Sequence, residues 1–420
     1  MPTTRRELLA LASGAAVAAA VAPTGAASAG PRPGKAVGTW AAPPTSIPPT
    51  GLRTLSDQTV RHVVHVSTGG DQIRIRLTNE FGALPLKIGE VHVARRAGTG
   101  ASTDTVPGSD RRVTFGGRAA VTVPAGSPFV SDPADLRVEG GGDLVVSLYL
   151  PEPTPVTTLF AFSYQDNVIA AGNVTGARRV TATETIQQVL FLSGVSVRSG
   201  ATAIVTLGDS ITNGANTQAN LNHRWPDLLA ARLGFGHGVV NVGISGNRLL
   251  HDPNPPAGNP AEAYAAYFGP SALRRFDRDV LAQPGAADVI VLLGINDLGH
   301  PGTSAPASEV VSADDLIGGH RQLIARSRPA GLRIFGGTIL PFKDDTLGFY
   351  SAENEQKRQT VNRWIRTGGE YDGVIDFDRA MRSPADPLRL NPAYDSGDHL
   401  HPNDAGMVVM AAAVPLRFFR

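Results

Sequence analysis

A serine, a histidine and a carboxylate stand at positions where they could carry out acyl transfer. Ser210 follows a short apolar run, and Asp398 and His401 precede the last helix-like stretch of the chain. A serine that attacks an ester needs a histidine to take its proton and a carboxylate to orient that histidine. Because Asp398 and His401 are three residues apart, one loop can present both. The sequence therefore predicts a triad of Ser210, His401 and Asp398.

Neighbouring residues offer alternative assignments for the base and its carboxylate. His399 competes with His401, but it directly follows Asp398, so the two side chains would diverge. Asp395 competes with Asp398 and has the poorer spacing to His401. A metal site built from Asp398, His399 and His401 is also conceivable, although no further ligand stands at a suitable spacing.

The remaining polar residues each have a structural interpretation beside the functional one. Ser210 alone is a favoured N-cap residue. Gly246 and Asn296 are both suited to turns. We interpret Asp209 as a turn residue that fixes the loop by hydrogen bonding. Only their combination in one chain favours chemistry over structure.

The second half of the chain alternates between buried strands and helices. Continuous apolar runs are typical of strands in a parallel sheet that is covered on both faces. They lie at residues 203–207, 239–242, 289–293, 334–340 and 374–377. Helical stretches lie between or after them, at 226–233, 271–281, 314–327, 353–365 and 405–418. This alternation predicts an open α/β domain over 199–420, with ligands beyond the carboxyl ends of its strands.

The preceding region is strand-rich. Ile73, Ile75 and Leu77 alternate with polar residues, which is the period of a strand with one buried face. Glycine and proline clusters interrupt such runs at short intervals. We expect a β-sandwich or jelly-roll-like domain over 58–198, preceded by a Pro/Gly-rich arm over 30–57.

The first 29 residues resemble a twin-arginine export signal. Arg5 and Arg6 precede an apolar, alanine-rich run, and Ala27-Ser28-Ala29 fits a cleavage site before Gly30. We expect this segment to be removed and the protein to be secreted, rather than anchored in a membrane. Loss of the segment would make the net charge of +1 formally zero, which argues against nucleic acid as a partner. The chain has no cysteine, so thiolate chemistry and disulfides are excluded.

Four segments together resemble the four sequence blocks of the SGNH (GDSL) hydrolase superfamily, in the same order. They are residues 208–211, with Ile211 where the family usually has leucine, 243–248, 294–297 and 398–402. The resemblance implies a flavodoxin-like, three-layer α/β/α catalytic domain with a parallel sheet. It also implies a serine esterase that needs no metal or organic cofactor. Its oxyanion hole would consist of the Ser210 N–H, the Gly246 N–H and the Asn296 Nδ2.

Residues 222–226 and 240–250 resemble a subgroup of acylhydrolases and arylesterases that is associated with xylan degradation. This resemblance implies a short acyl ester as the substrate, such as acetyl groups on a polysaccharide, with Arg248 as a substrate-binding residue. A solvated surface charge is the alternative for Arg248. An acyltransferase, a lipase or phospholipase, and a non-catalytic carbohydrate-binding protein remain alternative functions, because a fold does not fix a substrate.

Overall fold

The computed structural model describes residues 34–419. The export signal expected at 1–29 lies outside these residues. Within residues 34–419, no helix has the length and apolar composition that crossing a membrane requires.

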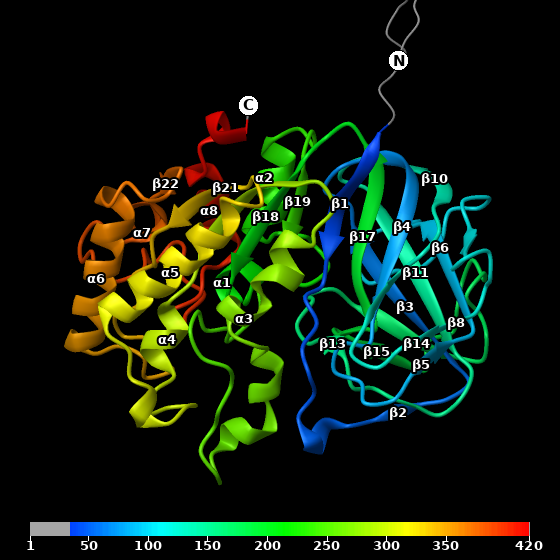
Figure 1. The fold of residues 1–420 in the computed structure, drawn as a ribbon, viewed down its shortest axis with the longest axis horizontal. Helices are drawn as coiled ribbons and strands as arrows, with labels where there is room; N and C mark the ends of the chain where they lie inside the picture. Colours follow the sequence, from blue (N-terminus) through cyan, green and yellow to red (C-terminus); the bar gives the residue numbers. More distant parts are fainter. Residues whose placement is uncertain (1–33, 420) are drawn as a thin grey trace, which may run out of the picture. The chain divides into compact units, whose positions relative to one another are not determined.

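Two antiparallel sheets form the first part of the described chain (Figure 1). One sheet has the order β1-β17-β4-β10, with β9 also paired to β4, and the other has the order β15-β14-β3-β11-β6-β7. The first sheet consists of β1 Lys35–Ala41, β4 Gly70–Thr78, β9 Pro128–Val130, β10 Ala134–Val138 and β17 Leu192–Ser199. The second consists of β3 Gln58–His65, β6 Glu90–Arg95, β7 Arg111–Val113, β11 Asp143–Leu150, β14 Asn167–Ala171 and β15 Glu184–Ile186. Three two-stranded pairs complete the region: β2 Thr54–Leu55 with β12 Thr154–Pro155, β5 Leu86–Ile88 with β8 Val121–Val123, and β13 Leu159–Phe160 with β16 Val189–Leu190.

The alternating sequence pattern explains why the two sheets face each other. Ile73, Ile75 and Leu77 of β4 are fully buried, whereas the intervening arginines are not. They share one hydrophobic core with Val146 and Leu148 of β11, which belongs to the other sheet. A strand that buries every second side chain against another sheet is the building unit of a β-sandwich. The predicted strand-rich region is therefore confirmed.

Part of the expected arm is a strand. Residues 35–41 form β1, which pairs antiparallel with β17 from Lys35↔Ser199 to Ala41↔Gly194. Val37 and Ala41 also join the core of the α/β region. The strand was not expected because it adjoins the proline-rich residues 42–53 and was counted with them as one arm. Its pairing with β17 and its contacts with the neighbouring core stabilise it.

A parallel five-stranded sheet forms the second part, in the order β19-β18-β20-β21-β22. Its strands are β18 Ala203–Gly208, β19 Gly238–Asn241, β20 Ala286–Leu292, β21 Arg333–Gly337 and β22 Gly373–Ile375. Every residue of β18 is buried, so both faces of the sheet are covered. The chain leaves β18 toward β19 on one side and then continues from β20 on the other. The strand order thus reverses beside β18, where an open α/β sheet places its ligands.

Helices cover this sheet, as Figure 1 shows. The α-helices are α1 Ser210–Asn213, α2 Trp225–Arg232, α3 Ala272–Phe276, α4 Ile295–Gly299, α5 Ala313–Ser327, α6 Ala352–Thr367, α7 Phe377–Met381 and α8 Asp404–Ala413. Short 3-10 helices are η1 Pro49–Gly51, η2 Pro260–Ala263, η3 Ala265–Phe268, η5 Ala307–Glu309 and η6 Leu416–Phe419, and η4 Asp277–Leu281 is a π-helical turn. One group of contacting helices is α2, α7 and α8, and another is α3, α5 and α6. This arrangement confirms the predicted α/β domain with a parallel sheet.

Several element bounds differ from the sequence expectation. The expected helix at 271–281 divides into α3 and the π-helical turn η4, and the expected helix at 405–418 ends at Ala413. Strand β21 ends at Gly337 rather than at residue 340. The Thr338 N–H makes the last backbone bond to β22, at Ile375 O, and Thr338 Oγ1 donates to Asp376 Oδ1. Apolar runs continue past strand ends wherever the loop after the strand is also buried.

The sandwich and the α/β sheet contact each other directly. The Gly38 N–H of β1 donates to Pro284 O at 2.7 Å, and the Val239 N–H of β19 donates to Ser67 Oγ at 2.8 Å. The first bond and the shared core around Val37 make β1 a common element of both regions.

Candidate active site

Ser210 lies where the central strand turns into a helix. Strand β18 ends at Gly208, Asp209 caps helix α1, and Ser210 is the first residue of that helix. The Asp209 carboxylate accepts a hydrogen bond from the Ile211 N–H at 3.0 Å, which is the loop-fixing contact that we expected of it. Asp209 is buried, and burial raises its pKa to about 7. The turn presents the Ser210 side chain at the carboxyl edge of the sheet.

A continuous chain of hydrogen bonds joins the three predicted triad residues. Ser210 Oγ lies 2.8 Å from His401 Nε2, and His401 Nδ1 lies 2.6 Å from Asp398 Oδ2. An ionised carboxylate only accepts hydrogen bonds, so Nδ1 must carry the imidazole proton. Nε2 then has a free lone pair and accepts the Ser210 hydroxyl. This tautomer is the one that a general base needs.

Asp398 is held as a carboxylate by its surroundings. Burial alone would raise the pKa of Asp398, but hydrogen bonds from the His401 imidazole and from backbone N–H groups lower it well below its usual range. Its Oδ1 accepts from the Leu400 N–H at 3.0 Å and the His401 N–H at 2.8 Å. Its Oδ2 also accepts from Asn216 Nδ2 at 2.9 Å. Sequence reasoning missed Asn216, whose distance along the chain gives no signal.

The competing residues form a separate pair. His399 Nδ1 lies 2.5 Å from Asp395 Oδ2, and the His399 side chain is about half exposed. Neither residue lines the pocket around Ser210. Within residues 34–419, no group of three or more histidine and acidic side chains is arranged to hold a metal ion.

Gly246 and Asn296 line the same pocket as Ser210 and His401. Gly246 has a φ of +77°, and a Cβ atom there would lie 2.1 Å from the Phe268 ring, so only glycine fits. Asn296 Nδ2 donates one hydrogen to Asn247 O at 3.0 Å. An amide nitrogen carries two hydrogens, so the second remains available to a ligand. The structure therefore brings all three expected oxyanion donors to one place.

Asp297 connects the loop that contains Gly246 to helix α4, which carries Asn296. Its two carboxylate oxygens accept from the Leu249 N–H at 2.7 Å and the Leu250 N–H at 2.9 Å. The side chain is buried, and burial raises its pKa to about 6. Because Asp297 follows Asn296 directly, it fixes the distance between Asn296 and Gly246. Adjacency to Asn296 was the one signal in the sequence that could have indicated this function.

Arg275 ties the ends of two strands together. Its buried guanidinium donates to Gly208 O at 3.0 Å, to Val242 O at 2.7 Å and to Asn247 Oδ1 at 3.0 Å. Asp279 neutralises its charge at 3.0 Å. The carbonyl group of Gly208, which precedes the turn to Ser210, and that of Val242, which precedes the loop to Gly246, are thereby fixed in relation to each other. Sequence reasoning missed Arg275, which resembles any helix-surface arginine.

The structure places Arg248, the predicted substrate-binding residue, outside the pocket that contains Ser210. The Arg248 side chain is buried, ion-paired to Glu309 at 2.6 Å and bonded to Asp252 O. It does not line the pocket that contains Ser210. Arg248 instead stabilises the loop that follows Gly246.

The profile of the GDSL-like lipase/acylhydrolase family matches residues 206–409. This chain carries a GDSL-like lipase/acylhydrolase domain. The resemblance to the SGNH hydrolases is thus confirmed, and the domain is that of an ester hydrolase. No curated protein matches the chain.

Solved structures of similar domains cover about half of the chain. One is a GDSL-like lipase from Bacteroides thetaiotaomicron, with 20% identity, a TM-score of 0.36, and coverage of 50% of this chain and 85% of that one. Another is an acetylxylan esterase from Geobacillus stearothermophilus, with 22% identity, a TM-score of 0.37, and coverage of 51% and 93%.

The pocket of the GDSL-like domain has a volume of about 430 Å³ and is rich in aromatic side chains. Those side chains are Phe162, Tyr164, Tyr264, Phe268, His300 and Phe349. The His300 ring lies 5.2 Å from that of Phe268 and 5.5 Å from that of Phe349. Burial lowers the pKa of His300 to about 3, so it is a neutral ring at ordinary pH. The site thus combines a small polar centre with a predominantly apolar wall.

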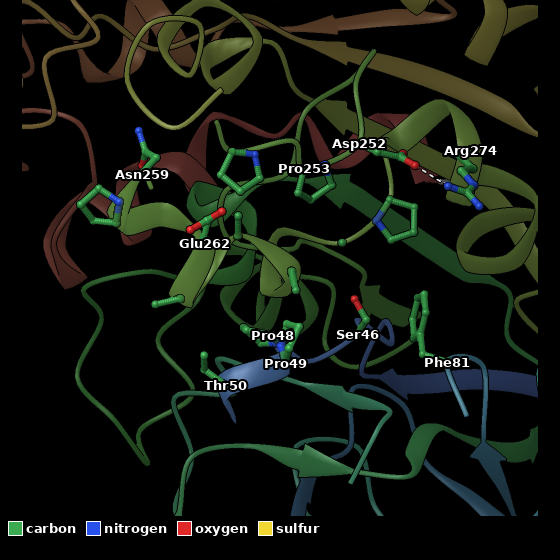
Figure 2. A pocket seen from close by; sticks show the side chains of 17 residues that line it. Ser46, Pro48, Pro49, Thr50, Phe81, Asp252, Pro253, Asn259, Glu262 and Arg274 are labelled. Atoms are coloured by element: carbon green, nitrogen blue, oxygen red, sulfur yellow. Dashed lines mark hydrogen bonds and ion pairs between the residues drawn. The ribbon is translucent and has the colours of Figure 1, made fainter. Parts of the chain in front are cut away.

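A larger hollow lies elsewhere in the structure, with a volume of about 750 Å³. Figure 2 shows Pro48, Pro49 and Phe81 on one side of it and the segment from Asp252 to Arg274 on the other. It contains none of the predicted triad or oxyanion residues. Size alone therefore does not identify the active site, and the smaller pocket is the candidate.

Proposed function

We propose that the protein is a secreted serine esterase that hydrolyses carboxylic esters of short acyl groups. Ser210 is its nucleophile, His401 its general base and Asp398 the carboxylate that orients the base. The observation that carries this proposal is the unbroken chain of hydrogen bonds, 2.8 Å from Ser210 to His401 and 2.6 Å from His401 to Asp398.

Acylation follows from the protonation states of this chain. His401 Nε2 removes the Ser210 proton as Oγ attacks the ester carbonyl, and Asp398 stabilises the imidazolium that forms. The oxyanion accepts hydrogen bonds from the Ser210 N–H, the Gly246 N–H and the free hydrogen of Asn296 Nδ2. The imidazolium then protonates the leaving alcohol.

Deacylation uses the same groups. His401 removes a proton from a water molecule, which attacks the acyl-enzyme and releases the acid, and Ser210 regains its proton. An acceptor alcohol in place of water would give acyl transfer with identical residues. The proportion of ester formed when an alcohol is added distinguishes a transferase from a hydrolase.

The proposed substrate is a short acyl ester, with acetyl groups on a polysaccharide as one form of it. The resemblance of residues 222–226 and 240–250 to the xylan-associated acylhydrolases supports this form. A pocket of about 430 Å³ also suits a compact ligand.

Hydrolysis of p-nitrophenyl acetate, butyrate and octanoate by the wild type and by Ser210→Ala tests the proposal. We expect the wild type to favour the shorter esters and the variant to lose nearly all activity. Activity of the variant equal to wild type would remove Ser210 as nucleophile. Absence of hydrolysis of every ester by the folded wild type would contradict the esterase proposal itself.

Export is the remaining part of the proposal, and it rests on the N-terminal sequence alone. Expression of the full chain in a host with a twin-arginine pathway, followed by N-terminal sequencing of the extracellular protein, tests it. A mature protein that begins at Gly30, and that is retained in the cell when Arg5 and Arg6 are both replaced by lysine, is expected. An extracellular protein that still begins at Met1 would contradict it.

A further inference from the structure

The β-sandwich contributes one wall of the pocket that contains Ser210. Residues 161–166, here called the wall segment, connect β13 to β14 of the strand-rich region. Two of its residues, Phe162 and Tyr164, line the pocket together with Gly246 and His401. The pocket is therefore incomplete without a segment that lies far from the GDSL-like domain in the sequence.

Hydrogen bonds fasten the wall segment to the catalytic region. Asn213, three residues after Ser210, donates from Nδ2 to Phe162 O at 3.1 Å. The Asn220 N–H donates to Tyr164 O at 2.9 Å, and Asn220 Oδ1 accepts from the Asp166 N–H at 2.7 Å. Because the first contact comes from helix α1 itself, the wall is positioned relative to the nucleophile.

Tyr164 reaches the loop that presents the oxyanion donor. Its φ is +51°, an uncommon conformation for a residue with a side chain, which persists only where the surroundings fix it. Burial raises the pKa of the Tyr164 phenol. Tyr164 lines the pocket together with Ser245 and Gly246. Asn213 Nδ2 donates to Ser245 Oγ at 3.0 Å as well as to Phe162 O, so one side chain connects the residue before Gly246 to the wall segment.

Phe162 belongs to an apolar rim around the mouth of the pocket. Three large apolar side chains on this mouth are well exposed: Phe162 at 36%, Tyr264 at 42% and Leu347 at 49%. Exposed apolar side chains that cluster at a pocket mouth mark a ligand surface more than scattered ones do. They come from three separate segments, so the clustering is not a consequence of one apolar stretch.

We propose that the wall segment is part of the substrate-binding site and that Phe162 is a specificity-determining residue. It packs against an apolar group in the alcohol part of the ester. The inference rests on the proposed esterase function and narrows its substrate class to short acyl esters of apolar alcohols, such as aryl esters. Among the forms of the proposed substrate, it therefore favours aryl and alkyl esters over the acetylated polysaccharide, because a sugar ring carries hydroxyl groups on most of its carbons and would cover less of the apolar rim.

Phe162→Ala tests this proposal, with Phe129→Ala as the matched control. Phe129 lies in β9, is also 36% exposed and does not line the pocket. For phenyl acetate, we expect Phe162→Ala to lower kcat/KM about tenfold, mainly through KM. For methyl acetate we expect a change of less than about twofold, since methanol offers little apolar area. Phe162→Leu should keep most of the wild-type kcat/KM for phenyl acetate, and Phe129→Ala should match the wild type.

Equal loss on both esters, or equal behaviour of the two alanine variants, would overturn the proposal. Hydrolysis of acetylated xylan with a kcat/KM above that of phenyl acetate would overturn it as well. An NMR titration that measures the binding of phenyl acetate to the Ser210→Ala protein separates substrate binding from catalysis. Weaker binding after Phe162→Ala is added supports a substrate-binding function of the wall segment, even if Ser210 proves not to be the nucleophile. Unchanged binding contradicts that function, even if Ser210 is the nucleophile.

Discussion

Replacement of Asp398 by asparagine reverses the hydrogen bonding of the catalytic histidine. The amide oxygen can take the position of Oδ1 and keep the bonds from the Leu400 and His401 N–H groups. The amide nitrogen then faces two donors, His401 Nδ1–H and Asn216 Nδ2. His401 can resolve its clash only by moving its proton to Nε2. In that tautomer it can no longer accept the Ser210 proton.

We therefore expect Asp398→Asn to lower kcat by about 10⁴, which corresponds to roughly 5 kcal/mol of transition-state stabilisation. The assay is steady-state hydrolysis of p-nitrophenyl acetate, with thermal unfolding to show that the variant is folded. Asp395→Asn is the control, because Asp395 forms the equivalent pair with His399 outside the pocket. It should retain activity within about threefold of wild type, as expected for a substitution outside the reacting groups.

A comparable loss of kcat in both variants would contradict this expectation, because the loss would then come from a change in the loop rather than from the histidine tautomer. A large loss in Asp395→Asn alone would make His399 the base. An Asp398→Asn variant with wild-type kcat would remove the carboxylate from the mechanism.

Three further predictions follow from the oxyanion donors and from a buried histidine. Asn296→Ala should lower kcat about 10²- to 10³-fold with little change in KM, and an unchanged kcat would exclude its amide as a donor. Gly246→Ala should lower both kcat and the melting temperature, because its φ of +77° and the 2.1 Å approach to Phe268 exclude a Cβ atom; a wild-type melting temperature would contradict that geometry. His300 has a pKa lowered to about 3 by burial, so below pH 6.5 the unfolded chain binds a proton that the folded chain does not, and stability falls as the pH falls. The free energy of unfolding, measured with urea, should therefore fall between pH 7.5 and pH 5 by about 2 kcal/mol less in His300→Phe than in the wild type. An equal fall in both proteins would contradict the burial of His300 as a neutral ring.

Much of the catalytic arrangement could be predicted because local sequence determines it. Ser210, Asn296 and His401 each stand beside an element whose apolar pattern is strong. The carboxyl ends of parallel strands meet at one edge of the sheet, so the positions of Ser210 and Asn296 in the sequence predicted their proximity in space. His401 precedes α8 instead, and its spacing to Asp398 and the family resemblance indicated it.

Other features could not be predicted, because they depend on contacts between distant segments. Arg248 follows the glycine loop as a ligand-binding residue would, yet Glu309 and the backbone at Asp252 hold it in a buried site. Likewise, nothing in the strand pattern of the sandwich indicates that Phe162 and Tyr164 reach the Ser210 pocket. Their placement depends on Asn213 and on the left-handed backbone of Tyr164.

Covalent trapping identifies the nucleophile of the esterase reaction. The wild type, Ser210→Ala and His401→Ala are incubated with diethyl p-nitrophenyl phosphate, and peptide mass spectrometry locates the diethylphosphoryl group. We expect one group per chain, on Ser210, no labelling of Ser210→Ala, and much slower labelling of His401→Ala. A label on another residue, or equal labelling of the His401→Ala variant, would contradict this expectation.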